Sequence, residues 1–326
     1  MTTPQNSAGA SRRSGVTAVH SVNRIVFTVP EIDAAIKFYT AFGMNVQPAG
    51  QQVNLYTHGH EHRWMTVLAN GKPKALQYIS FGIYAKDEAA FKQKIDKMGI
   101  ACAAPAVAAT LGEAGGLWLK SPDGTVFQLV VADKVSPSQK SPRSAARPDP
   151  RSGATSPMRT QIGQVRPRWL SHTLVFTADV TRLIDFCESV LGLRLSDRSG
   201  GLVAFMHTPH GSDHHLLACV MSNGPGLHHT SWDVGSLDEV GEGSEQLRVA
   251  GYPDGWGIGR HVLGSNYFYY ARDPWGSFAE YSYDIDFIAP SRDWKAGDFA
   301  PEDSFYLWGP AVPEWFTVNT EAAGGL

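Results

Sequence analysis

The sequence predicts an α+β protein of two domains, each built from a pair of β-α-β-β-β modules. Three observations carry this prediction. The 326 residues suffice for about two domains of ordinary size, and 43% of them are hydrophobic, which is enough for real cores. A stretch rich in Pro, Ser and basic residues divides the chain near its middle. The two flanking halves repeat the same order of strand-like and helix-like segments.

Composition changes mark the borders of these parts. We assign residues 1–19 to a flexible N-terminus, 20–133 to the N-terminal domain, 134–168 to a linker, 169–286 to the C-terminal domain and 287–326 to a Trp/Pro-rich tail. The linker holds six prolines, six serines and eight Lys/Arg among 35 residues, so we expect it to be exposed. We expect the tail to pack on its own domain, with a lid over an open side or a subunit contact as the alternatives.

The first half begins with a strand-like segment at Asn23, followed by an amphipathic stretch at 32–42 that ends at Gly43. A second strand-like start at 76–81 precedes a helical pattern at 87–98. The half closes on a turn at Pro122-Asp-Gly and a strand that reaches Gln128, which are the residue types of a tight hairpin.

The second half repeats this order. A strand-like segment at His172 is followed by an amphipathic stretch at 180–191 that ends at Gly192. A second strand start at 227–232 precedes a helical pattern at 237–250, and a Pro274-Trp-Gly turn leads into a strand with Glu280. Four matched starts and two matched closing turns favour internal duplication over coincidence.

Charge and cysteine content exclude several classes of partner. The net charge of −3 and the isoelectric point near 6.4 give no electrostatic case for nucleic acid or an anionic membrane. No apolar run approaches the length of a membrane span. Three scattered cysteines fit a reducing compartment, so we expect a cytoplasmic protein.

Histidine is concentrated in the second half, where eight of the twelve lie between His172 and His261. Three equivalent positions of the duplication read, in the second half, His172, His229 and Glu280, at intervals of 57 and 51 residues. In the first half, at intervals of 55 and 50, the same positions carry neutral groups, which are Asn23, Tyr78 and Gln128. We therefore expect a metal site in the second half alone and a non-catalytic N-terminal domain.

Two imidazoles and one carboxylate on one face of a metal leave about three coordination positions open. This arrangement suits a non-haem Fe(II) centre that holds an organic substrate and O₂ together, and the same ligand set also serves Mn(II). His228 is the close rival of His229. Strand alternation should place the two on opposite faces, and the match between the halves favours His229.

The sequences around these positions are distinctive: His172-Thr, Leu-His-His229-Thr, Gly259-Arg-His261, and Tyr270-Ala-Arg-Asp-Pro274-Trp-Gly followed by Glu280. In these motifs the chain resembles the type I extradiol ring-cleavage dioxygenases of the vicinal oxygen chelate superfamily, which include biphenyl-2,3-diol and catechol 2,3-dioxygenases. The resemblance covers residues 20 to about 286.

The resemblance implies the vicinal oxygen chelate fold and O₂-dependent extradiol cleavage of a small aromatic diol to a ring-opened semialdehyde-type acid. It implies His172, His229 and Glu280 as Fe(II) ligands and His214 as the catalytic acid–base, with His215 as the runner-up. His261 and Tyr270 should lie near the bound phenolate and oxygen. We also expect a homo-oligomer.

Two other functions are compatible with such a fold: a glyoxalase-type metalloisomerase and a non-catalytic small-molecule-binding protein. Neither accounts as well for a full ligand set in one half beside several further histidines. Apolar and aromatic side chains near the ligand strands favour an apolar, alkyl-, halo- or aryl-substituted ring over one with an extra carboxylate. These are Leu174, Trp232, Tyr267 and Phe268. The sequence is also compatible with a trihydroxylated ring as the substrate.

Overall fold

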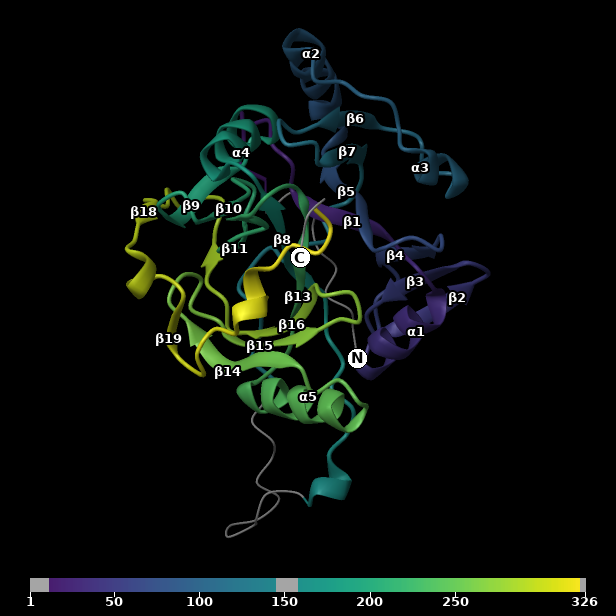
Figure 1. Cartoon of the computed structure of the whole chain (residues 1–326). Helices are drawn as coiled ribbons and strands as arrows, with labels where there is room; N and C mark the ends of the chain where they lie inside the picture. The colour runs from purple at the N-terminus through teal and green to yellow at the C-terminus, as the bar shows by residue number, and fades with distance from the viewer. Residues whose placement is uncertain (1–11, 145–157, 323–326) are drawn as a thin grey trace.

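The computed structural model describes residues 12–144 and 158–322, and these residues form two large mixed sheets with few helices (Figure 1). The first sheet has seven strands in the order β2-β3-β4-β1-β5-β7-β6, and the second has ten in the order β18-β9-β10-β12-β8-β13-β16-β15-β14-β19. The predicted α+β class is confirmed.

The elements of the first sheet and its helices are β1 (Ser21–Val29), α1 (Ile32–Ala41), β2 (Asn45–Ala49), β3 (Gln52–Tyr56), β4 (Arg63–Ala69), β5 (Ala75–Ile83), α2 (Glu88–Met98), α3 (Ala106–Thr110), β6 (Leu117–Lys120) and β7 (Val126–Val131). Those of the second part are β8 (Leu170–Thr177), α4 (Val180–Phe186), β9 (Arg194–Ser199), β10 (Val203–His207), β11 (Ser212–Asp213), β12 (Leu217–Met221), β13 (Gly226–Asp233), α5 (Leu237–Val249), β14 (Gly255–His261), β15 (Tyr267–Arg272), β16 (Phe278–Tyr283), β17 (Phe287–Ile288), β18 (Gly297–Asp298) and β19 (Tyr306–Trp308).

Both sheets are assembled in the same way. The first strands of two successive modules pair antiparallel at the centre, β1 with β5 and β8 with β13. The last strand of each module then returns parallel to its own first strand, as β16 does beside β13. The second module departs from the expected pattern: the strand that should follow α2, its second, is reduced to a single bridge between Ala101 and Leu119, because the chain turns at Pro105 into the short helix α3.

The helical stretches of the two halves end at equivalent glycines with left-handed backbone. Gly43 has φ +91°, and a Cβ there would lie 2.0 Å from the carbonyl oxygen of Val165. Gly192 has φ +71°, and its Cβ would lie 2.4 Å from the carbonyl oxygen of Thr17. Only glycine combines this conformation with such close packing, which is why the sequence signal for both helix ends is accurate.

One hydrophobic core runs through both halves. The ring of Phe42, at the end of α1, stacks on that of Tyr281 in β16 with centroids 4.2 Å apart, and the Tyr281 hydroxyl donates to the Phe42 carbonyl over 2.8 Å. The duplicated halves therefore pack as one body through aromatic contacts that neither half could make alone.

The segments predicted to be flexible or exposed are partly packed. Of the expected flexible N-terminus, residues 1–11 lie outside the described part, but Ala18 and Val19 are buried and Arg12 pairs with Asp87 at 2.8 Å. Of the linker, residues 145–157 lie outside the described part, while Val165 is buried on the core. Composition underestimates the packing of these ends because a few apolar or paired groups suffice to anchor a polar segment. No helix among the described residues is long and apolar enough to cross a membrane.

Candidate metal centre

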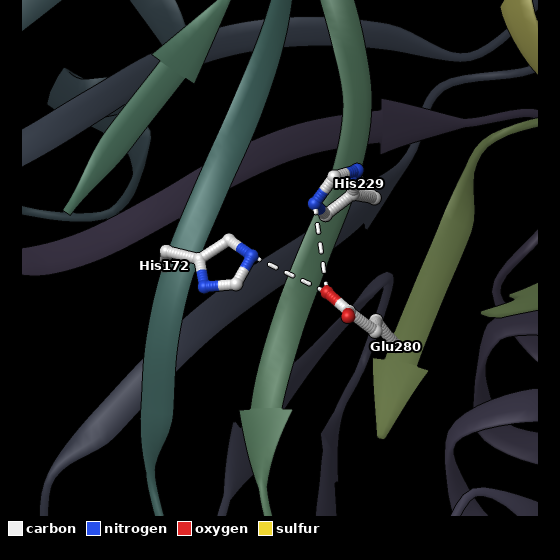
Figure 2. Close-up of side chains that lie close together, drawn as sticks. All are labelled: His172, His229 and Glu280. Atoms are coloured by element: carbon white, nitrogen blue, oxygen red, sulfur yellow. Dashed lines mark ion pairs between the residues drawn. The ribbon is translucent and has the colours of Figure 1, made fainter. Parts of the chain in front are cut away.

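Three side chains from the middle of the second sheet converge on one point (Figure 2). His172 Nε2 lies 3.3 Å and His229 Nε2 3.7 Å from Glu280 Oε2, and the ligating atoms all lie within 4.8 Å of one another. The strand register explains the meeting. Ser231 of β13 pairs with His172 of the neighbouring strand β8 and with Glu280 of the other neighbour, β16. His229 is two residues before Ser231 and so shares its face of the sheet.

Two of these three atoms lack the partners that buried polar groups need. All three side chains are buried, with Glu280 fully so, and neither His229 Nε2 nor Glu280 Oε2 has a hydrogen-bond partner. An orphaned buried carboxylate oxygen beside a free imidazole nitrogen is costly unless a cation takes both. The donor set therefore fits a divalent metal ion with a mixed nitrogen and oxygen preference. Among the described residues this is the one such group of three.

A chain of hydrogen bonds aims His172 at the metal position. Ser171 Oγ donates to Asp213 Oδ2 over 2.6 Å, so its oxygen accepts from His172 Nδ1, 3.2 Å away. With its Nδ1 proton held in this hydrogen bond, the ring can offer the Nε2 lone pair to a metal. On the carboxylate side, Asn266 Nδ2 donates to Glu280 Oε1 over 3.0 Å and leaves Oε2 free.

His228 orients His229 in the same way. Its Nε2 donates to the carbonyl of Phe316 over 2.8 Å, so its Nδ1 accepts from His229 Nδ1 at 2.7 Å. The expectation that only one of the pair could face the cavity is wrong, because both line it. The reason is a β-bulge: the register of β13 against β8 slips between Leu227 and His229, which breaks strict alternation at that point.

The side chains of the second adjacent pair, His214 and His215, do point to opposite sides. The one that faces the cavity is His215, whereas the prediction favoured His214. His215 lines the cavity, and its ring lies 3.9 Å, centroid to centroid, from that of His172. His214 points away from the cavity, to Asp197 on β9, with its Nε2 2.8 Å from Oδ2. Burial lowers the pKa of His215 well below its ordinary value, so the ring in the cavity is neutral.

His261 and Tyr270, the two further residues that the resemblance implies, are hydrogen-bonded to each other. The Tyr270 hydroxyl donates to His261 Nε2 over 2.9 Å, and His261 Nδ1 donates to the carbonyl of Phe305 over 2.7 Å. Burial raises the pKa of Tyr270 well above its ordinary value, and the nearby carboxylate of Glu280 adds to the effect. Tyr270 therefore keeps its proton and remains a donor at one wall of the cavity.

The cavity around these groups is mainly apolar and is closed in part by the C-terminal tail. Its apolar lining includes Leu174, Val203, Phe205, Val220 and Leu263. The tail adds Ser304, Phe305, Phe316 and Thr317, consistent with the lid alternative. None of the described residues that line it is Lys, Arg or Asp.

The equivalent positions of the first half are occupied differently. Tyr78 donates to Glu113 Oε2 over 3.0 Å, and Gln128 Nε2 donates to the carbonyl of Glu113 over 2.8 Å. The carboxylate of Glu113 also pairs with Arg24 and Arg63. Side-chain and backbone groups of the protein thus satisfy the polar groups of Tyr78 and Gln128, in contrast to the orphaned atoms of the second half.

Several residues of the site are not indicated by the sequence reasoning above. Asn266 lies between His261 and Tyr270, so the motif itself could have indicated it. Asp213 directly precedes the His214-His215 pair, but its bond to Ser171 depends on the fold. No feature of the sequence shows which residues of the tail line the cavity, because only the path of the tail across the sheet brings them there.

Comparisons with known proteins show which family the chain resembles. Residues 169–281 match the family model described as the Glyoxalase/Bleomycin resistance protein/Dioxygenase superfamily. The chain is 46% identical to metapyrocatechase 2 of Cupriavidus necator over 97% of its own length and 98% of that protein.

Solved structures show the same fold. The Mn(II)-bound glyoxalase from Novosphingobium aromaticivorans has a TM-score of 0.72 at 24% identity, over 92% of this chain and 94% of that one. The 2,2',3-trihydroxybiphenyl 1,2-dioxygenase from Sphingomonas wittichii has a TM-score of 0.69 at 20% identity, over 91% of this chain and all of that one. With the relative at 46% identity along nearly the whole length, the chain belongs to the type I extradiol ring-cleavage dioxygenases of the vicinal oxygen chelate superfamily.

Proposed function

We propose that this dioxygenase holds Fe(II) through His172, His229 and Glu280 and cleaves a catechol whose ring carries no charged substituent. The observation that carries the metal assignment is the pair of buried, partnerless atoms, His229 Nε2 and Glu280 Oε2, beside His172 Nε2. Held by these three residues, Fe(II) would bring the diol and O₂ together and would lower the pKa of the phenol.

The protein's own groups then handle protons and orientation. We assign His215, rather than His214, as the acid–base, because its neutral ring lines the cavity and its Nδ1 is already bonded to His214. His215 Nε2 is the atom left to accept a proton from the diol and later return it. The Tyr270 hydroxyl donates to His261 Nε2, so its oxygen is left to accept a hydrogen bond from a substrate hydroxyl, and His261 holds it in place beside a cavity that the tail helps to line. Both oxygen atoms of O₂ enter the ring-opened semialdehyde acid.

The lining supports a neutral substrate. A carboxylate on the ring would be buried among leucine, valine and phenylalanine side chains with no Lys or Arg among the described lining residues to pair with it. We expect a loss of at least about 100-fold in kcat/KM for such a substrate, which corresponds to about 3 kcal/mol.

A substrate panel tests both parts of the proposal. Apoprotein reconstituted anaerobically with Fe(II), or with Mn(II) in parallel, is mixed with catechol, 4-methylcatechol and 3,4-dihydroxyphenylacetate. O₂ uptake and the yellow product are then followed. We expect turnover of the neutral diols with Fe(II). No O₂ uptake from any diol by iron-loaded protein would contradict the assigned site, and a preference for the charged diol would contradict the substrate class.

We further propose a homo-oligomer in the cytoplasm. All three cysteines are free, which suits a reducing compartment. Light scattering of the purified protein measures the mass of the assembly, and a monomer at micromolar concentration would contradict the first part.

A further inference from the structure

A row of hydrogen-bonded side chains leads from strand β9 to the cavity. Asp197 Oδ2 lies 2.8 Å from His214 Nε2, and His214 Nδ1 lies 3.1 Å from His215 Nδ1. The row ends at the ring of His215, whose remaining nitrogen, Nε2, belongs to a residue of the cavity lining.

The row is held rigidly from several sides. The His214 side chain is 1% exposed and that of Asp197 is 8% exposed. The backbone N–H of Gly297, in the tail, donates to Asp197 Oδ1 over 2.7 Å, and the indole ring of Trp294 packs edge-on to His214 with centroids 5.4 Å apart. The backbone of His214 is itself tied down, since its N–H donates to the carbonyl of Asp286 over 2.6 Å.

The carboxylate of Asp197, at the far end of the row, sets the direction of the hydrogen bonds. A carboxylate only accepts, so His214 must donate from Nε2 to Asp197. When His214 carries this proton alone, its lone pair lies on Nδ1, and that nitrogen accepts from His215 Nδ1. His215 therefore carries its proton on Nδ1, and its Nε2 presents a lone pair to the cavity.

We infer that Asp197 and His214 are positioning residues that set the tautomer and orientation of His215, so that its Nε2 is free to take a proton from the diol. This inference rests on the proposed role of His215. It separates the functions of the two adjacent histidines: His215 meets the substrate, and His214 acts only through His215.

Asp197→Asn tests the direction of the row. The Gly297 N–H needs an acceptor, so the introduced amide keeps its oxygen there and turns its NH₂ toward His214 Nε2. His214 must then accept at Nε2 and donate from Nδ1, which makes His215 accept at Nδ1 and carry its proton on Nε2. We expect kcat to fall about 100-fold or more, because a wrong tautomer of a catalytic histidine costs up to about 10⁴-fold in hydrolase triads. Iron content and anaerobic diol affinity should stay within about threefold of wild type.

The tautomer itself is read by ¹⁵N NMR of histidine-labelled apoprotein, with His215→Gln identifying the signals of that ring. In wild type we expect a protonated Nδ1 and an unprotonated Nε2, and in Asp197→Asn the reverse. His214→Asn, which retains an acceptor near the position of Nδ1, should keep more activity than His214→Leu. His207→Gln is the matched control, since His207 is buried nearby and bonds Ser196 Oγ at 2.7 Å but makes no hydrogen bond to a side chain of the row.

A proton on Nε2 of His215 in the wild-type apoprotein, or wild-type kcat in Asp197→Asn, would overturn the inference. If the tautomers reverse as expected but no diol is consumed by any of the proteins, the row stands and the proposed function fails. The two results are therefore distinguishable.

Discussion

Replacing His228 by phenylalanine should weaken metal binding without removing a ligand. His228 sits between three aromatic rings, those of Phe176, Phe278 and Phe316, at centroid distances of 4.9, 5.2 and 4.7 Å. Phenylalanine preserves that packing and deletes both hydrogen bonds of the imidazole. His229 Nδ1 then loses its 2.7 Å partner in a site with no exposed surface to supply water.

The expected magnitude follows from that single lost partner. An unsatisfied buried donor costs about 1–3 kcal/mol, and when metal binding demands that His229 keep its proton on Nδ1, this cost appears in the metal affinity. We expect the dissociation constant for Fe(II) to rise about 10- to 100-fold, which is the range for losing a group that orients a ligand.

Anaerobic titration of apoprotein with Fe(II) against a competing chelator measures this change. Phe278→Leu is the packing control, because Phe278 touches the His228 ring but makes no hydrogen bond to it, and it should bind metal within about threefold of wild type. Unchanged affinity in His228→Phe would refute the reasoning. A complete loss of metal, equal to that in His229→Ala, would show instead that His228 is the ligand.

Three further results are expected. His215→Ala should keep its iron and lose about 10²- to 10⁴-fold in kcat, measured by O₂ uptake, whereas iron loss would make it a ligand. Glu321→Ala should lower the free energy of unfolding by about 3–5 kcal/mol in chemical denaturation, because Lys74 is left buried without its 2.9 Å carboxylate partner; a loss under about 1 kcal/mol would contradict this. Burial lowers the pKa of His20 from 6.5 to about 4, so the unfolded chain takes up the proton first as the pH falls. The stability from His20 is complete above about pH 6.5 and falls by about 1.4 kcal/mol per unit toward pH 4; His20→Gln apoprotein should show a shallower fall, and an identical slope would refute the assignment.

Much of the site can be predicted from the sequence, because equivalent positions recur at the strand starts of the two halves. The sequence indicates His172, His229 and Glu280 because the matched positions in the first half mark the first and last strands of the modules. In the structure they come from β8, β13 and β16, whose register aligns them on one face. Their roles as ligands remain a proposal, but their convergence is predictable from sequence alone.

The orientation of the adjacent histidine pairs is decided only by the tertiary structure. Alternation along a strand is a local rule, and it says that neighbours face opposite ways without saying which faces inward. At Leu227–His229 the slip in pairing with β8 brings both His228 and His229 to the cavity, and such a slip depends on a partner strand more than fifty residues away. At His214–His215 the outcome depends on Asp197, which holds one ring away from the cavity.

The tail shows most clearly which features the sequence predicts and which depend on the tertiary structure. Its prolines and tryptophans indicate that it packs against the protein, since such aromatic rings are costly to expose. Which carbonyls it offers to His228 and His261 depends on its path across the second sheet, where β19 pairs with β14 and Phe305 and Phe316 reach the cavity. Sequence pattern thus dictates the modules, their ends and the ligand types, because these rest on local periodicity and duplication. Proton placement around the metal is set by contacts between distant segments, and these exist only once the chain has folded.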